Sequence, residues 1–223
     1  MHGMNHRQGG SGFTLIEVMI TVFVVAVGLL SVAGLQAFAK KSNFDAIQRT
    51  QAAALAQDLI ERIRANAAQG AGYVTDASAG WSSSNAPSAP TQSCSTSSTA
   101  SSPACTPAQV VAFDKYQWTR ALFGAAESLN GESAGGLSEP TACITNATAP
   151  CGAYTIAIAW RGITPLPPAD SGDTTNPANN RCGSGNAAYD DIASPGTDIR
   201  LRRVIVVRTV IDDHSGRCAG VTP

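Results

Sequence analysis

The chain begins with one long apolar stretch, and shorter segments with regular apolar and polar positions follow it. Residues 13–39 read FTLIEVMITVFVVAVGLLSVAGLQAFA, and no charge occurs from Val18 to Ala39. About 20 such residues cross the hydrocarbon core of a bilayer as a helix, so the segment is predicted to span a membrane. A buried core helix is the alternative, but a core helix rarely needs so long an uncharged run.

Beyond Lys40 the pattern changes to one apolar stripe among charged residues, which is typical of a soluble amphipathic helix. The stripe recurs at steps of three or four residues, or multiples of them, and consists of Phe44, Ile47, Leu55, Leu59 and Ile63. Because no helix-breaking residue separates the two patterns, we predict one continuous helix from Phe13 to about Ala68. Gly70 and Gly72 are predicted to end it.

A second helix and two strands are predicted further along. Thr106 and Pro107 are typical of a helix start, and residues 106–122 can place Val110, Phe113, Trp118 and Leu122 on one side. Residues 154–160 alternate strictly, which predicts a strand with Tyr154, Ile156, Ile158 and Trp160 on one face. Residues 199–211 are rich in β-branched side chains and suit a central strand followed by an edge. The segments 82–105, 143–151 and 162–198 are predicted to be loops.

The composition excludes few functions, but it argues against nucleic-acid binding. The chain has 223 residues and a formal net charge of −1, which gives no general attraction to phosphate backbones, so no nucleic-acid partner is expected. Only 14% of residues are charged. The one basic cluster is Arg200, Arg202 and Arg203, which we predict to be a solvated strand face.

Six cysteines point to disulfides in an oxidising compartment, because they form no C-x-x-C motif and the chain begins with an export-type segment. They are Cys94, Cys105, Cys143, Cys151, Cys182 and Cys218. Fifteen pairings are possible. We favour local pairs, 94 with 105, 143 with 151 and 182 with 218, because each brackets a segment rich in turn-forming residues.

No catalytic, metal or cofactor site is predicted. The motifs of serine hydrolases, P-loop proteins and zinc proteases are absent, and His214 is the only histidine outside the first six residues. Oxygen-bearing side chains could bind calcium at residues Asp170, Asp173, Asn176, Asn179 and Asn180. Their spacing does not match an EF-hand, and turn formation explains them equally well. The chain is therefore expected not to be an enzyme.

The N-terminal boundary of the apolar segment is abrupt. A polar, glycine-rich leader, MHGMNHRQGGSG, ends at Gly12, and GFTLIEV follows at once. This junction strongly resembles the processing site of type IV prepilins. The resemblance implies that a membrane-embedded prepilin peptidase cuts between Gly12 and Phe13 and then methylates the new amino terminus of Phe13.

The same resemblance gives a role to Glu17, the carboxylate inside the apolar stretch. A charge at the bilayer centre costs about 2.5–3.5 kcal/mol on insertion scales, so such residues are candidates for function. In the family, this glutamate is thought to neutralise the amino terminus of a neighbouring subunit during filament assembly. The alternative is that Glu17 reaches the membrane interface and has no further role.

Segments over most of the chain resemble a narrower family, the PilV-like type IV pilus modification proteins, which are minor pilins. These segments are GFTLIEVMI, AALAQDLIERIRAN, CTPAQ with the following FD and QW, YTIAIAWRG and RRVIVV. The resemblance implies an α+β type IV pilin fold, with a long helix packed on a small antiparallel sheet and loops tied by disulfides.

The domain organisation that this implies is a leader at 1–12, a transmembrane half-helix at 13–39, a soluble half-helix at 40–69 and a periplasmic globular domain at 70–223. The expected location is the inner membrane, with a single pass, and then the pilus. Expected partners are other major and minor pilins, the prepilin peptidase and the inner-membrane assembly platform. The expected role is to support pilus assembly, adhesion or twitching motility.

Two other interpretations stay open. A pseudopilin of a type II secretion system would carry the same N-terminal helix. In a third interpretation, residues 1–39 are a signal peptide cut after the AFA of residues 37–39, and the remainder is an exported binding module or enzyme. That apolar run is longer than the usual signal peptide core, and it contains Glu17.

Overall fold

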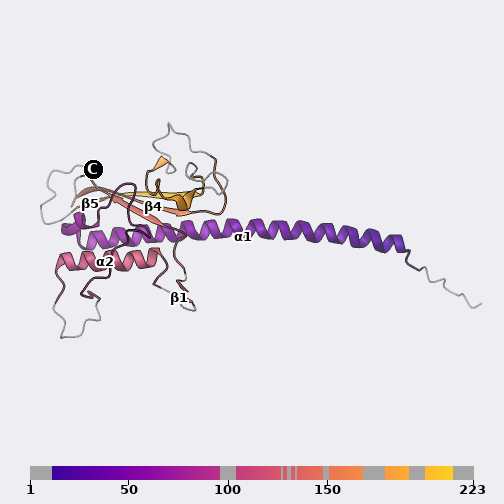
Figure 1. Cartoon of the computed structure of the whole chain (residues 1–223), viewed down its shortest axis with the longest axis horizontal. Helices are drawn as coiled ribbons and strands as arrows, with labels where there is room; N and C mark the ends of the chain where they lie inside the picture. Colours follow the sequence, from indigo (N-terminus) through magenta and orange to yellow (C-terminus); the bar gives the residue numbers. More distant parts are fainter. Residues whose placement is uncertain are drawn as a thin grey trace, which may run out of the picture. The chain divides into compact units, whose positions relative to one another are not determined.

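The computed structural model describes residues 12–95, 104–126, 135–147, 151–167, 179–190 and 199–212, and the backbone of 128–129 and 132–133. Its elements in chain order are α1 (Leu15–Ala65), η1 (Ala67–Tyr73), α2 (Pro107–Leu122), β1 (Ser128–Leu129), β2 (Glu132–Ser133), β3 (Thr141–Thr145), β4 (Gly152–Arg161), η3 (Ala187–Tyr189) and β5 (Arg202–Ile211), most of which are labelled or visible in Figure 1. The chain divides into two compact units, residues 1–44 and 45–223.

The predicted long N-terminal helix is confirmed, with slightly different ends. The α-helix stops at Ala65, and a 3₁₀ helix takes the two glycines that were expected to end it. The Asn66 side chain donates to the carbonyl of Pro107 at 2.8 Å, which fastens the end of α1 to the start of α2.

The buried face of α1 differs from the predicted stripe. Its buried residues are Gln48, Ala52, Ala56, Leu59, Ile60 and Ile63, whereas Phe44 and Ile47 are exposed. The prediction was wrong at these two positions because it followed bulky side chains. The small side chains of Ala52 and Ala56 let the neighbouring elements approach α1 closely, so alanine forms much of the contact.

Three antiparallel strands form the main sheet in the order β3-β4-β5. Tyr154, Ile156, Ile158 and Trp160 of β4 all face the core, as the alternation predicts. β4, and not β5, is the central strand of the described sheet, and β3 includes residues 143–145, the first three of the segment 143–151 expected to be a loop. The period-two pattern identified the faces of the strands, but strand order depends on pairing between distant segments.

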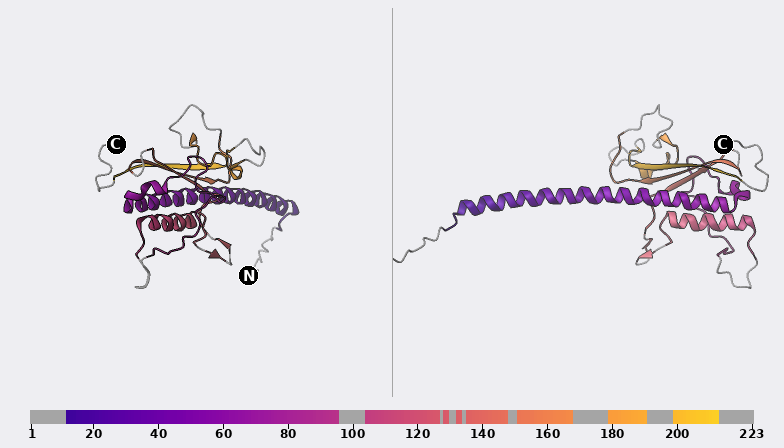
Figure 2. Two further views of the ribbon diagram at one scale, coloured as in Figure 1. Left: turned by 60° about the vertical axis from the view of Figure 1, so that its left-hand side comes forward. Right: turned by 180° about the vertical axis from the view of Figure 1, so that it is seen from behind.

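Residues 45–65 of α1 lie between α2 and the sheet, as Figures 1 and 2 show. Thr106 and Gln109 form a capping box at the start of α2, with Pro107 in its first turn, as expected. The fully buried Trp118 donates from its ring nitrogen to the carbonyl of Leu55 at 2.9 Å. The buried positions of α2 include Val111 and Thr119, so its inner face is rotated from the predicted one.

A partly buried polar cluster links α1, η1 and α2. Arg62 contacts Asp58 and Asp114, with nitrogen-to-oxygen distances of 2.9 Å in both pairs. The hydroxyl of Tyr73 donates to the other oxygen of Asp114 at 2.7 Å. Burial, followed by the hydrogen bond to Asp114, raises the pKa of the Tyr73 hydroxyl far above its ordinary value, so this hydroxyl stays protonated and keeps donating.

The outer face of the sheet is covered by the segment around residues 180–190, and a disulfide fastens it there. Cys143 pairs with Cys182, at a Cα separation of 5.7 Å, which corrects the local pairing expected from the sequence. Cys143 lies opposite Ala157 in the ladder, six residues beyond Cys151, which is about 20 Å along a strand. A disulfide spans at most about 7 Å between Cα atoms, so Cys143 cannot reach Cys151.

The other cysteines give a mixed outcome. The expected pair of Cys94 with Cys105 is confirmed. Cys151 forms a disulfide, and its partner is neither Cys143 nor Cys182, which pair with each other. Cys218 lies outside the described residues.

The arginines of β5 are not a solvated face, in contrast to the prediction. Arg202 is buried and donates to the carbonyls of Asn180 and Cys182, and burial lowers the pKa of its guanidinium from the ordinary value. Arg203 donates to the carbonyl of Thr164 at 2.6 Å and approaches Asp45 at 3.6 Å. Both side chains therefore hold loops against the same end of the sheet.

Candidate processing and assembly segment

The junction between Gly12 and Phe13 lies outside the helix, and both residues are exposed. α1 begins at Leu15, and the backbone nitrogens of Glu17 and Val18 donate to the carbonyl of Thr14 at 3.1 and 3.3 Å. The Thr14 hydroxyl also accepts from the Glu17 nitrogen, at 3.4 Å. Thr14 therefore closes the first turn, and the peptide bond before Phe13 remains free of helical hydrogen bonds. Exposed termini of this kind are accessible to peptidases.

Glu17 lies in the first turn of α1 and is exposed. The first backbone N–H groups of a helix have no partner within the helix, and they give this end a partial positive charge. A carboxylate in the first turn is stabilised by that charge. The same carboxylate can attract a second positive group, such as an amino terminus.

The surface of α1 before the second unit is apolar and uncovered by the described chain. Every residue from 12 to 44 is exposed, and the helix contains a stretch long and apolar enough to cross a membrane. The hydroxyls of Thr21 and Ser31 donate to the carbonyls of Val18 and Val27, at 2.8 and 3.0 Å. Their polar groups are thus satisfied within the helix, which a segment in lipid requires.

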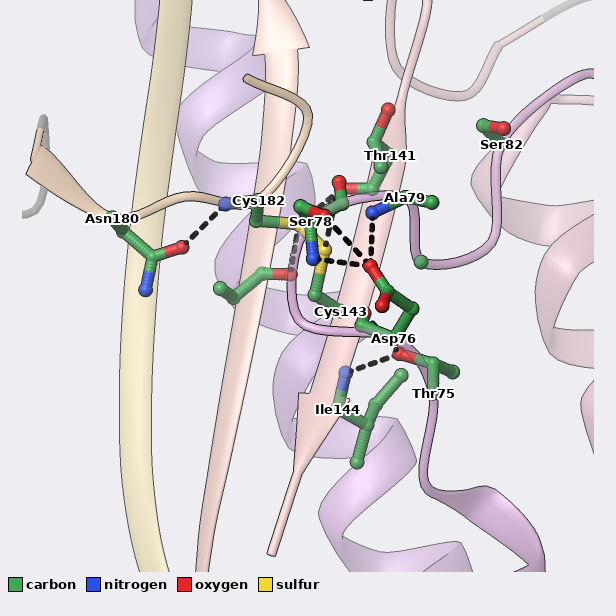
Figure 3. The surroundings of a disulfide bond; sticks show 12 residues. Thr75, Asp76, Ser78, Ala79, Ser82, Thr141, Cys143, Ile144, Asn180 and Cys182 are labelled. Carbon is green, nitrogen blue, oxygen red and sulfur yellow. Dashed lines mark hydrogen bonds between the residues drawn. A yellow bond between two sulfur atoms is a disulfide. The ribbon is translucent and has the colours of Figure 1, made fainter. Parts of the chain in front are cut away.

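A polar groove lies beside the Cys143–Cys182 disulfide, in the second unit, and encloses about 470 Å³. Next to the lining residues Ser78 and Ala79, Asp76 accepts three hydrogen bonds, from the backbone nitrogens of Ser78 and Ala79 and from the Ser78 hydroxyl, all at 2.7 Å (Figure 3). These bonds lower the pKa of the Asp76 carboxyl to about 2. The groove holds no residue that the sequence singled out as a site.

The described residues contain no group of three or more side chains suited to holding a metal. Of the candidate calcium ligands, Asn180 accepts from the backbone nitrogen of Cys182 at 2.9 Å, which is a turn contact. Asp170, Asp173 and Asn176 lie outside the described residues, as does His214.

The structure places Gly12, Phe13 and Glu17 at the start of α1, and the five cysteines among the described residues lie in the second unit. Sequence reasoning missed a functional candidate in the apolar loop at residues 163–167, which was included in a longer loop. The run ITPLP, with four apolar residues among five, was the available signal.

One N-terminal helix is long and apolar enough to cross a membrane, and its later residues pack in the core of a small α+β domain. The family model of the type IV pilin Tt1218 matches residues 34–116, and the prokaryotic N-terminal methylation motif matches residues 7–33. No curated protein and no solved structure gives a match.

Together the two matches support an assignment of the chain to the type IV pilins. That family points to a structural, non-enzymatic subunit that assembles with other pilins. Neither match separates the PilV-like subfamily from other pilins.

Proposed function

We propose that the chain is a minor type IV pilin, cut between Gly12 and Phe13 by the prepilin peptidase and methylated at Phe13. Residues 13–39 anchor it in the inner membrane, residues 40–69 continue the helix, and residues 70–223 form a periplasmic domain. The observation that carries the proposal is the start of α1, where an exposed, non-helical junction directly precedes an apolar helix that the described chain leaves uncovered.

Glu17 provides the assembly contact in this proposal. Cleavage creates a positive amine on Phe13, about 6 Å of helical rise from Glu17. The amine of one subunit and the carboxylate of the next offset each other's loss of hydration, and their pairing sets the axial register of two helices. Apolar packing alone specifies that register poorly, because lipid tails are as apolar as leucine.

The minor role rests on the resemblance of five segments to pilus modification proteins. A minor subunit is present in few copies and supports initiation of the filament, and through it adhesion or twitching motility. Deleting the gene is expected to reduce piliation strongly, with no loss of exoprotein secretion. Unchanged piliation would contradict the minor-pilin role, and lost secretion would favour a type II pseudopilin.

The test of the assembly contact is Glu17→Gln, which removes the charge and keeps the size of the side chain. The variant is expected to be processed and to reside in the membrane, but to be absent from sheared filaments. The matched control is Glu61→Gln, because Glu61 lies on the same helix, is exposed and pairs with Arg64, an exposed neighbour. Equal incorporation of Glu17→Gln and wild type would refute the role of Glu17.

A further inference from the structure

The loop after β4 exposes an unusual run of apolar residues. Ile163, Thr164, Pro165, Leu166 and Pro167 are all exposed, with Ile163 at 43% and Leu166 at 40%. Several consecutive exposed apolar residues disfavour solubility and are retained mainly where they serve a function. The loop is thus a candidate interaction surface.

The loop is fixed in place by its backbone. The nitrogens of Gly162 and Leu166 donate to the carbonyls of Leu201 and Arg200, at 2.7 and 2.9 Å, and the carbonyl of Thr164 accepts from Arg203. A Cβ atom at Gly162 would lie 2.6 Å from the guanidinium carbon of Arg203, so a larger residue there would require that side chain to shift.

The composition of the loop suits an environment that is poor in water. Pro165 and Pro167 carry no N–H group, and the N–H of Leu166 is already bonded to Arg200. An unpaired backbone donor is costly to remove from water, and this loop has few to remove.

The loop lies beside the first residue of the second unit. Arg203 joins the two, since it donates to the carbonyl of Thr164 and approaches the carboxylate of Asp45. Asp45 follows Ala39 by six residues of continuous helix, or about 9 Å. The headgroup region is about 5–8 Å thick on each side of the hydrocarbon core. If residues 13–39 span the membrane, the loop starts within reach of the headgroups.

The charges near this end are suited to an anionic surface. Lys40 and Lys41 follow the apolar segment directly and are exposed, and the guanidinium of Arg203 lies against the loop at the carbonyl of Thr164. Asp45 is offset by Arg203, while Glu139 remains as an exposed acidic residue in the strand connection before β3. Basic residues beside a membrane are attracted to anionic lipids.

We propose that the loop Ile163–Pro167 rests on the anionic bilayer surface that anchors the chain, so that the globular unit docks on the membrane before assembly. This inference rests on the proposed membrane anchor at residues 13–39. Ile163 and Leu166 enter the boundary between headgroups and acyl chains, and the exposed side chains of Lys40 and Lys41 contact lipid phosphates. Extraction into a filament then has to break this contact.

The experiment uses the full chain in nanodiscs that contain phosphatidylglycerol and lipids brominated close to the headgroup. A fluorescent non-natural amino acid is placed at Thr164, at Val210 or at Val25, one position per sample. Val210 is the control, because it is 48% exposed at the other end of β5. That end lies beside Arg64, which donates to Thr209 at 3.0 Å and is about 28 Å of helix away from Asp45. Val25 reports on the anchor itself.

Quenching at positions 25 and 164, without quenching at 210, is the expected result. Quenching at 25 but not at 164 would overturn the loop contact and leave the anchor intact, whereas no quenching at 25 would refute the anchor. The variant Ile163→Ser with Leu166→Ser is expected to lose quenching at 164 and to keep it at 25. If quenching at 164 persists in this variant, the short helical connection between the membrane anchor and Asp45 is enough to keep position 164 near the lipid. The docking proposal then fails. If position 164 is shielded from solvent only in assembled filaments, a neighbouring pilin covers the loop there. That outcome also refutes the membrane contact.

Discussion

Replacing Cys143 with alanine tests how the outer face of the sheet is held. The disulfide to Cys182 closes a loop with a sequence separation of 39 residues. In the chain-entropy model, losing a cross-link of that span costs about 4 kcal/mol of folding free energy. The segment around residues 180–190 is expected to lose protection against hydrogen exchange first, because this bond fastens it to β3.

The assay combines urea unfolding of the full chain in detergent with alkylation of free thiols and peptide mass spectrometry. In the Cys143→Ala variant the liberated thiol is expected at Cys182. The matched control is Cys94→Ala, which opens a loop with a separation of 11 residues, for an expected cost of about 3 kcal/mol, and leaves Cys182 unreactive. Alkylation of Cys151 in the Cys143→Ala variant would refute the connectivity. An unchanged unfolding midpoint would refute the stabilising role.

Three smaller perturbations probe other contacts in the second unit. Trp118→Phe keeps an aromatic ring but removes the hydrogen bond to the carbonyl of Leu55, and thermal unfolding should show a loss of about 1 kcal/mol or more; an unchanged unfolding temperature would contradict this. Gly162→Ala places a methyl group against the guanidinium of Arg203, which must shift away from the carbonyl of Thr164, and a cost of up to about 1 kcal/mol is expected; a much larger loss would mean that this side chain cannot move. The pKa of Asp76 is lowered to about 2, so its contribution to stability is complete above about pH 4 and is lost as the pH falls through 2. Asp76→Asn should therefore flatten the acid dependence of unfolding between these values, and an unaltered pH profile would be inconsistent with the three hydrogen bonds.

The parts of the fold that depend on local sequence could be predicted. The apolar run and the lack of a breaker predict a single long helix, and the capping residues Thr106 and Pro107 predict the start of α2. The alternation of β4 predicts which side chains face the core, because side chains alternate strictly along a strand. The junction at Gly12 and Phe13 is likewise contained in a few consecutive residues.

The parts of the fold that depend on contacts between distant segments could not be predicted from the sequence. Ala52 and Ala56 form the buried face of α1 only because α2 and the sheet approach there, and a hydrophobic pattern gives alanine little weight. Cys182 reaches Cys143 because the segment around it folds over the sheet, which spacing along the chain does not reveal. Arg202 is buried for the same reason, since its partners are the carbonyls of that segment.

The most direct test of the proposed function is the mass of the N-terminus of the protein isolated from the producing organism's membranes and sheared filaments. We expect the chain to begin with N-methylated Phe13, as removal of the leader at Gly12 requires. A chain that begins at Lys40 would mean that residues 1–39 were an export signal. In that case Glu17 would have no role in assembly, and the proposed function would be wrong.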